Sequence, residues 1–183
     1  MNRTPYIRIR GFTLMEVLVA LVIISIGLLG IAAMQASAIT STHASQTESL
    51  VSIEARSLAD AMQANPNYWA GGNFPTSAFT VAGPATGSST GTVTDAGLGA
   101  TVPSCASTAC TDIQLAAYDV QTWGAQLNTQ IPGATGHILC TTAAPTACNI
   151  TINWTQKAST AVNSGTQSTA TPTTMSYTLT NQF

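Results

Sequence analysis

The sequence predicts an α+β protein with one long N-terminal helix, followed by a region that holds a second helix and a few strands. Three observations predict this class. An apolar run near the N-terminus is long enough to cross a membrane, a helical pattern free of proline continues well past that run, and strand-like segments lie near the C-terminus. Helices and strands that are segregated along the chain are typical of α+β folds rather than of alternating α/β folds.

The apolar run, from Phe12 to Met34, contains a single charged residue, Glu16. Residues 17–34 provide 18 positions that are interrupted only by one serine and two glycines, which satisfies the length of a membrane-spanning helix. Three of the five basic residues lie in the first ten positions. Because positive charge stays on the cytoplasmic side, we expect a single-pass helix with its N-terminal end in the cytoplasm and the rest of the chain outside the inner membrane.

Beyond the apolar run the chain keeps a helical pattern. Apolar residues recur mostly every three to four positions, at Ile39, Ala44, Leu50, Val51, Leu58, Ala61 and Met62. No proline occurs between Phe12 and Asn65, and Pro66 then biases Asn65 away from the helical conformation. We therefore expect one helix from about Thr13 to Ala64, apolar all round in its first half and with one apolar face in its second half.

The segment 70–104 is rich in Gly, Ser, Thr, Ala and Pro, and we expect it to form mostly surface loops, with weak strand signals at 79–81 and 91–93. Three firmer strands are expected at 137–140, 149–156 and 176–183.

A second helix is expected from Asp112, whose carboxylate can cap it, to Gln130. One side of this helix carries the apolar residues Ile113, Ala116, Ala117, Val120, Trp123 and Leu127. We expect Trp123 to lie in the core, with the carboxylate of Asp119, one turn before it, accepting a hydrogen bond; a recognition pair is the alternative.

Two further aromatic residues, Tyr68 and Trp69, follow the long helix directly. They fit either an exposed binding patch or a cap over the strands, and the sequence does not separate these two interpretations.

The four cysteines form two pairs that are close in the sequence, Cys105 with Cys110 and Cys140 with Cys148. An even number of cysteines in a chain with an export-like N-terminus predicts disulfides, and short-range closure favours the two local bonds among the three possible connectivities. A metal site is the alternative, since His137 precedes Cys140 by three residues. The chain has no Cys-x-x-Cys pair, and we expect no resident metal or cofactor.

The charge composition excludes several classes of function. Charged residues make up 7% of the chain, and only Arg56 and Lys157 are basic after the first ten positions. Such a chain cannot neutralise a run of phosphates, so we expect no nucleic-acid binding. The two histidines and the serines show no pattern of a catalytic set, and no Gly-rich phosphate loop is present, so we expect no enzyme activity.

Glu16 is the residue whose chemistry needs an explanation. A carboxylate inside a membrane span costs about 2.5–3.5 kcal/mol on insertion scales, while the helix dipole offsets only about 0.3–1 kcal/mol. A cut between Gly11 and Phe12 would create an α-amine, with a reference pKa of about 7.7–8, that is mostly protonated at neutral pH. If that amine belongs to a neighbouring subunit, its pairing with Glu16 would fix the axial register of two apolar helices.

These residues resemble a known family. The segment RGFTLMEVLVALVIISIGLLGIAAMQ, residues 10–35, is similar to the class III signal of type IV pilins and pseudopilins. The resemblance implies that prepilin peptidase cuts after Gly11, that the new N-terminal residue Phe12 is N-methylated, and that Glu16 guides subunit assembly. The stretches MQANP (62–66), LAAYDVQTWGAQLNTQIPG (115–133) and ITINW (150–154) extend the resemblance to minor pilins of the PilV, or pilus-modification, type.

The resemblance also implies a type IV pilin fold, in which the second half of the long helix packs on a small antiparallel sheet. It divides the chain into a leader (1–11), a hydrophobic membrane and assembly helix (12–38), an amphipathic half of the same helix (39–65) and a disulfide-containing globular head (66–183). The implied protein is a non-enzymatic minor pilin that leaves inner-membrane lipid, joins other minor pilins and the major pilin, and primes type IV pilus assembly at the tip, on the cell surface.

Three alternatives stay open at this point. A minor pseudopilin of a type II secretion system carries the same kind of signal. An ordinary secretory signal cleaved after Ala38 would instead release a secreted binding or adhesin module. An uncleaved membrane anchor is the third alternative.

Overall fold

The structure is a computed structural model of the whole chain, and it describes residues 11–156 and 172–183. The predicted leader other than Gly11, and most of the Ser/Thr-rich stretch before the last expected strand, lie outside the described residues. The chain falls into two compact units, the first ending at His43 and the second starting at Ala44.

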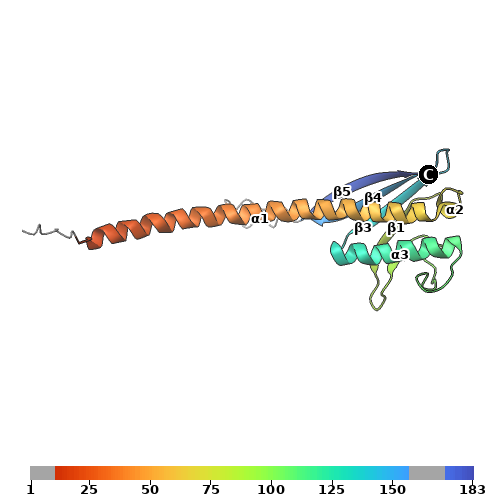
Figure 1. Cartoon of the computed structure of the whole chain (residues 1–183), viewed down its shortest axis with the longest axis horizontal. Helices are drawn as coiled ribbons and strands as arrows, with labels where there is room; N and C mark the ends of the chain where they lie inside the picture. Colours follow the sequence, from red (N-terminus) through yellow and green to blue (C-terminus); the bar gives the residue numbers. More distant parts are fainter. Residues whose placement is uncertain (1–10, 157–171) are drawn as a thin grey trace, which may run out of the picture. The chain divides into compact units, whose positions relative to one another are not determined.

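The long helix α1 (Leu14–Ala64) has 51 residues and is continuous, as the proline-free pattern predicts (Figure 1). It ends where expected, because Asn65 leaves the helical region at φ −122° and ψ 63°. Pro66 then occupies the first position of a short helix, α2 (Pro66–Trp69), where its missing N–H costs nothing.

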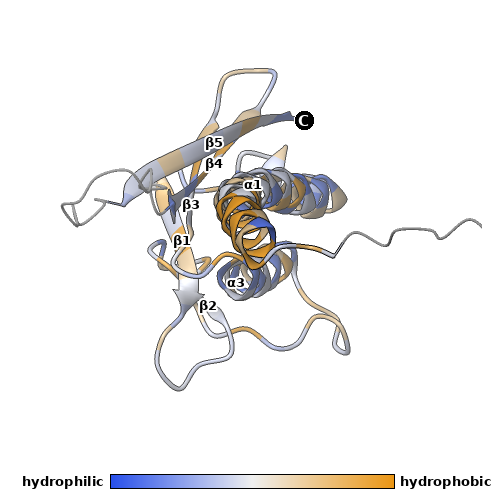
Figure 2. Ribbon diagram, turned by 90° about the vertical axis from the view of Figure 1, so that its left-hand side faces the viewer, coloured by the Kyte–Doolittle hydropathy of each residue, from blue (hydrophilic) through white to orange (hydrophobic). Residues whose placement is uncertain are grey.

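The first part of α1 is apolar on every side, which Figure 2 shows as an orange ribbon. Its large apolar side chains are exposed, between 44% at Val19 and 92% at Leu14. The second part of α1 belongs to the other compact unit and buries one face, as its amphipathic pattern predicts.

The sheet has five antiparallel strands in the order β2-β1-β3-β4-β5. These strands are β1 (Phe79–Pro84), β2 (Gly91–Val93), β3 (Thr135–Thr141), β4 (Ala147–Gln156) and β5 (Thr173–Gln182). The three strands expected near the C-terminus are β3, β4 and β5, each somewhat longer than its pattern indicated.

The expectation for the segment 70–104 is confirmed, because it is mostly loop and its two short strands, β1 and β2, begin at the two weak strand signals. Phe79 and Val81 point to the core and are buried, at 3% and 0% exposed. Two apolar residues give only a weak strand signal, and the pairing with β3 stabilises β1 as a strand.

The helix α3 (Asp112–Gln130) has the predicted bounds but a different cap. Thr111 is the N-cap residue, and its backbone N–H donates to Oε1 of Gln114 at 3.0 Å, as in a capping box. Asp112 is therefore the first helical residue and not the cap. Ile113, expected on the buried side, is 47% exposed.

Within the second unit, α3 and the C-terminal part of α1 lie side by side over the same face of the sheet (Figures 1 and 2). Asn181 of β5 donates from Nδ2 to the carbonyl of Ala59 at 3.2 Å, which ties α1 to that edge of the sheet. Gly124 of α3 lies against β1, since a Cβ atom there would stand 2.6 Å from Cγ1 of Val81. The core between the two helices and the sheet includes Val51, Ala55, Leu58, Met62, Val120, Leu127, Ile138, Ile150, Ile152 and Trp154.

Candidate functional site

The residues at the predicted cleavage site precede the helix. Gly11, Phe12 and Thr13 lie outside α1 and are exposed, Phe12 at 82%. A peptide bond in non-helical, exposed chain is open to an enzyme, so the bond between Gly11 and Phe12 is accessible in this structure.

Glu16 lies in the first turn of α1. Its backbone N–H donates to Oγ1 of Thr13 at 3.3 Å and to the Thr13 carbonyl at 3.1 Å. Thr13 therefore caps the helix, and Glu16 stands three residues later, as in the sequence of a capping box. A carboxylate at this position is favoured by the unpaired N–H groups of the first turn and by the helix dipole.

The described residues provide no ion pair for the Glu16 carboxylate. Phe12 precedes Glu16 by four residues, so an amine created at Phe12 would lie about one helical turn from the carboxylate of its own chain. The same amine on a neighbouring subunit is the other possible partner. Either pairing would remove the cost of an isolated charge in an apolar medium.

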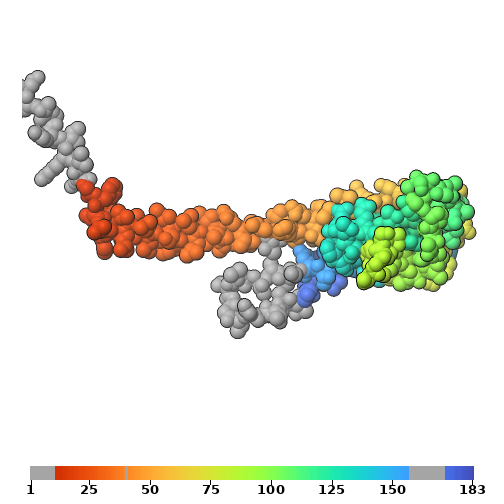
Figure 3. Space-filling model, turned by 90° about the horizontal axis from the view of Figure 1, so that it is seen from below, coloured from red at the N-terminus to blue at the C-terminus, as the bar shows by residue number. Residues whose placement is uncertain are grey.

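The apolar residues that follow Glu16 are at the surface, and Figure 3 shows them along the red and orange part of the chain on the face it draws. Among the described residues, one helix, α1, is long and apolar enough to cross a membrane. No residue of its apolar stretch is buried, whereas the core helix of a water-soluble protein would bury such a stretch.

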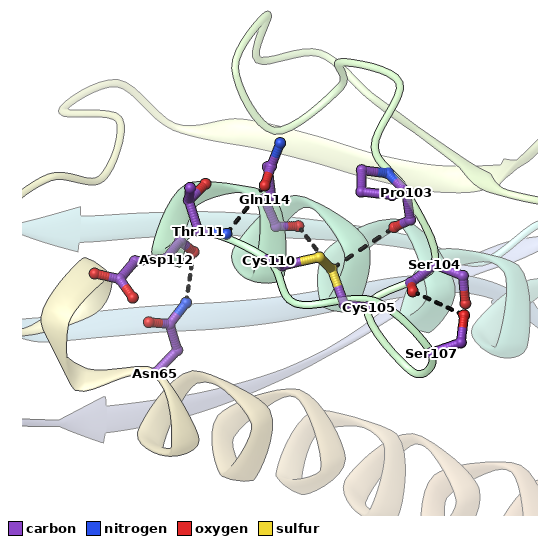
Figure 4. The surroundings of a disulfide bond; sticks show 9 residues. All are labelled: Asn65, Pro103, Ser104, Cys105, Ser107, Cys110, Thr111, Asp112 and Gln114. Atoms are coloured by element: carbon purple, nitrogen blue, oxygen red, sulfur yellow. Dashed lines mark hydrogen bonds between the residues drawn. A yellow bond between two sulfur atoms is a disulfide. The ribbon is translucent and has the colours of Figure 1, made fainter.

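One disulfide joins Cys105 and Cys110, directly before α3, with the two Cα atoms 5.6 Å apart (Figure 4). Near it, Asn65 donates from Nδ2 to the carbonyl of Asp112 at 2.7 Å. That hydrogen bond connects the end of α1 to the start of α3, so the disulfide closes a loop next to the junction of the two helices.

The other disulfide joins Cys140 and Cys148, which face each other in the register of β3 and β4 and are buried. The two local bonds favoured by the cysteine spacing are thus those in the structure. The alternative of a metal site at Cys140 fails, because its sulfur is bonded to Cys148 and is not available as a thiolate. His137 instead places Nδ1 at 3.1 Å from Oγ1 of Thr80 on the outer face of the sheet.

The sequence patterns missed a buried carboxylate, Glu54, which is 1% exposed. Its Oε1 accepts hydrogen bonds from Nε2 of Gln130 at 2.6 Å and of Gln126 at 3.4 Å. Its Oε2 has no hydrogen-bond partner among the described residues. Burial raises the pKa of Glu54, and the hydrogen bond from Gln126 lowers it to a smaller extent.

The position of Glu54 in the sequence indicates that it is buried. Glu54 stands three positions after Val51 and four before Leu58, on the apolar stripe of α1. A charged residue inside such a stripe faces the core rather than water, and its partners then come from the neighbouring helix.

Trp123 is buried, as predicted, but its hydrogen-bond partner differs from the prediction. Nε1 of Trp123 donates to the backbone carbonyl of Glu54 at 2.9 Å, and not to Asp119. The indole thus crosses to α1 instead of turning back along its own helix. Asp119 is half-buried, and burial raises its pKa.

Tyr68 and Trp69 are buried, at 4% and 1% exposed, which rules out an exposed aromatic patch. Their ring centroids lie 4.9 Å apart in an edge-to-face arrangement. Burial, and secondarily the charge of Asp95, raises the pKa of Tyr68 to about 12. These aromatics therefore serve packing after the end of α1.

Comparison with known proteins identifies one motif. The prokaryotic N-terminal methylation motif matches residues 7–32, which include Gly11, Phe12 and Glu16. No curated protein and no solved structure matches the chain. The motif indicates a type IV pilin-like or pseudopilin precursor that is processed by prepilin peptidase, and it fits inner-membrane anchoring and assembly with other pilins.

Proposed function

We propose that this chain is a minor type IV pilin. Prepilin peptidase removes the leader after Gly11, Phe12 becomes N-methylated, and the mature protein joins other minor pilins and the major pilin to prime pilus assembly at the tip. The main observation behind the proposal is that the methylation motif includes an exposed Gly11–Phe12 bond and lies over the exposed apolar half of α1.

The exposed apolar first half of α1 suits two environments, a lipid bilayer and the interior of a filament. Its side chains are exposed on all sides and would be stable in a lipid bilayer before assembly. In a filament, the same side chains would pack on the apolar helices of neighbouring subunits, which removes them from water equally well.

A charge pair formed by Glu16 would set the axial register in which these apolar helices pack. Apolar helices slide past each other at little cost, whereas one carboxylate and one amine attract strongly in a low-dielectric medium. We infer that Glu16 of one subunit pairs with the Phe12 amine of a neighbour. The Thr13 cap holds Glu16 in the first turn, close to where that amine would lie.

The two disulfides support a location of the C-terminal unit outside the inner membrane. Disulfides persist in the oxidising periplasm and at cell surfaces, and they are rare in the cytosol. This matches the orientation that the arginines of the first ten residues predict.

A minor pseudopilin of a type II secretion system is the second candidate, because the methylation motif fits pseudopilins as well. Deletion of the gene distinguishes the two. Loss of twitching with normal secretion supports the pilin, and loss of secretion with normal twitching supports the pseudopilin.

Mass spectrometry of the protein from native membranes tests the processing step. We expect a mature chain that starts at N-methylated Phe12. A start at Ile39 would mean that an ordinary secretory signal was removed after Ala38 and that a secreted module is released. An intact Met1 would mean an uncleaved membrane anchor.

Replacement of Glu16 tests the assembly step. We expect Glu16→Ala to be cleaved and methylated normally but to fall at least about tenfold in sheared pili, since one lost charge pair of about 1.4 kcal/mol changes an equilibrium tenfold. The matched control is Glu48→Ala, at an exposed position of the same helix. Equal amounts of both variants in sheared pili would contradict the pairing.

A further inference from the structure

The part of α1 in the second compact unit has an uncovered outer face, opposite the face that it buries. We call this the outer α1 face, and it consists of Ser49, Ile53, Arg56, Ser57, Asp60 and Ala64, all of them exposed. Ile53 is 58% exposed and lies between two serines, one turn before it and one turn after it. A large apolar side chain flanked by small residues suits contact with another helix.

The outer α1 face also carries two charges of opposite sign, Arg56 and Asp60. Arg56 is the one lysine or arginine among the described residues, which contain seven aspartates and glutamates. Within the described residues its guanidinium forms no ion pair, not even with Asp60 one turn later. A base followed by an acid four residues later is also the less favourable order for pairing within a helix. Both charges are therefore available to a partner.

The spacing of these two charges equals the spacing of the charges at the start of the mature helix. Arg56 precedes Asp60 by four residues, and the amine of a chain cut after Gly11 would precede Glu16 by four residues. Two parallel copies of α1 that are shifted by four residues therefore bring both acids of one copy level with both positive groups of the other. Without a shift, like charges would be level with each other. A shift of eight residues pairs Arg56 with Glu48 but leaves Glu16 without a base.

Both charge pairs can lie in one interface between two helices. Phe12 and Arg56 are 44 residues apart, as are Glu16 and Asp60. On a straight helix this separation leaves the two pairs about 80° apart around the axis. Helices that wind around each other in a right-handed sense follow an 11-residue repeat, and 44 residues are four such repeats. A gentle right-handed winding therefore brings both pairs to the same side.

We propose that the α1 helix of a second copy, parallel and shifted by four residues, covers the outer α1 face, with Asp60 of one copy paired with Arg56 of the other. This proposal rests on the proposed function, because the pair of Glu16 with the Phe12 amine of a neighbour requires the same shift. The parallel orientation keeps the apolar halves of both helices in one membrane or one filament. Because the contact is shifted, one copy keeps free acids and the other keeps free positive groups, so that a further subunit can add at either side.

Sedimentation of the natively processed protein in detergent micelles, over a range of protein concentrations, tests the proposal. The charge variants are Arg56→Asp, Asp60→Arg and the double reversal that carries both changes. The matched control is Glu48→Arg, an exposed charge reversal on the same helix that has no charged residue level with it at a shift of four. Glu16→Ala reports separately on the pairing that the proposed function requires. Far-UV circular dichroism checks that each variant is folded.

We expect the wild type to self-associate and each single reversal at position 56 or 60 to weaken the association about three- to tenfold at low salt, because a repulsion replaces an exposed attraction. The double reversal should restore the association to within about twofold of the wild type, since opposite charges meet again. Glu48→Arg should also stay within about twofold. The losses should shrink in about 1 M salt, which screens exposed charges.

Three results would overturn the proposal. A wild type that is monomeric at every concentration would exclude a second copy as the partner. Losses that the double reversal does not restore would place a different protein on the outer α1 face. Single reversals that associate like the wild type, together with a Glu16→Ala variant that associates more weakly, would exclude the Arg56–Asp60 pair and leave the proposed function intact. If Glu16→Ala also associates like the wild type, the pairing of Glu16 fails as well.

Discussion

The buried carboxylate of Glu54 leads to a prediction about stability and pH. Burial raises its pKa in the folded state, so the folded protein holds the proton of Glu54 to a higher pH than the unfolded chain does. The resulting stabilisation is fully present below the ordinary pKa of 4.5 and is lost as the pH rises through the raised value. Ionisation of the buried Glu54 carboxylate therefore weakens the contact between α1 and α3.

The substitution Glu54→Gln removes this charge and keeps an oxygen for the hydrogen bond from Gln130. A buried charged oxygen without a partner, as Oε2 is among the described residues, costs about 1–3 kcal/mol or more. The charge-assisted bond from Gln130, 2.6 Å long, offsets part of this cost and is weakened in the variant. We therefore expect Glu54→Gln to be more stable than the wild type by about 1–2 kcal/mol at pH 7.5, or roughly 2–8 °C in Tm.

The assay is urea unfolding of the full chain in detergent, followed by tryptophan fluorescence, because Trp123 contacts the Glu54 backbone. It is run at several values between pH 4 and pH 8. The difference between Glu54→Gln and the wild type should shrink toward zero near pH 4, where both side chains are neutral. Glu48→Gln, at an exposed position of α1, should follow the wild type at every pH. A wild type that is more stable than Glu54→Gln at pH 7.5, with parallel pH curves, would refute the reasoning.

Two further predictions concern packing and cross-linking. At Gly136 a Cβ atom would stand 2.5 and 2.6 Å from the Trp123 ring, which its hydrogen bond holds in place, so Gly136→Ala should lower the free energy of unfolding by about 2–3 kcal/mol. The control is Gly97→Ala, where an added Cβ atom would meet Asp95 Oδ1 at 3.3 Å and Ile113 Cδ1 at 3.6 Å. This variant should change the free energy of unfolding, measured by urea titration, by less than about 1 kcal/mol. Equal losses of stability in both variants would contradict this account. Replacing Cys140 and Cys148 together by alanine should cost about 2–3 kcal/mol through loop entropy, and the wild type in a reductant that opens this bond should lose a similar amount in thermal melting. Melting curves that do not change with reductant would count against a structural role for the disulfide.

The long helix could be predicted almost to the residue, because its determinants are local. The absence of proline between Phe12 and Asn65, the threonine before the first turn and Pro66 after the last turn each act on residues close to them in the chain. The same holds for the methylation motif, which is a property of consecutive residues.

The strands are harder to predict from local sequence patterns than the long helix. The strand β4 could be predicted because Ile150, Ile152 and Trp154 alternate over its length. The strands β1 and β2 carry too few apolar residues for a pattern, and they are strands because β3 and α3 lie beside them. The cap of α3 was assigned one residue too late, since Thr111 and Asp112 both have suitable side chains and the choice depends on the backbone.

By itself, the sequence determined the α+β class, the helix from Leu14 to Ala64, the apolar segment with its one carboxylate, and the local disulfide pairs, because each depends on residues that are near one another in the chain. Only the tertiary structure decided what Glu54 and Trp123 contact and in which order the strands pair. Those contacts join residues about 70 positions apart, and their geometry follows from how α3 packs along α1 over the sheet. No local pattern encodes that packing, since it results from the combined burial of side chains from both helices and from β1, β3 and β4.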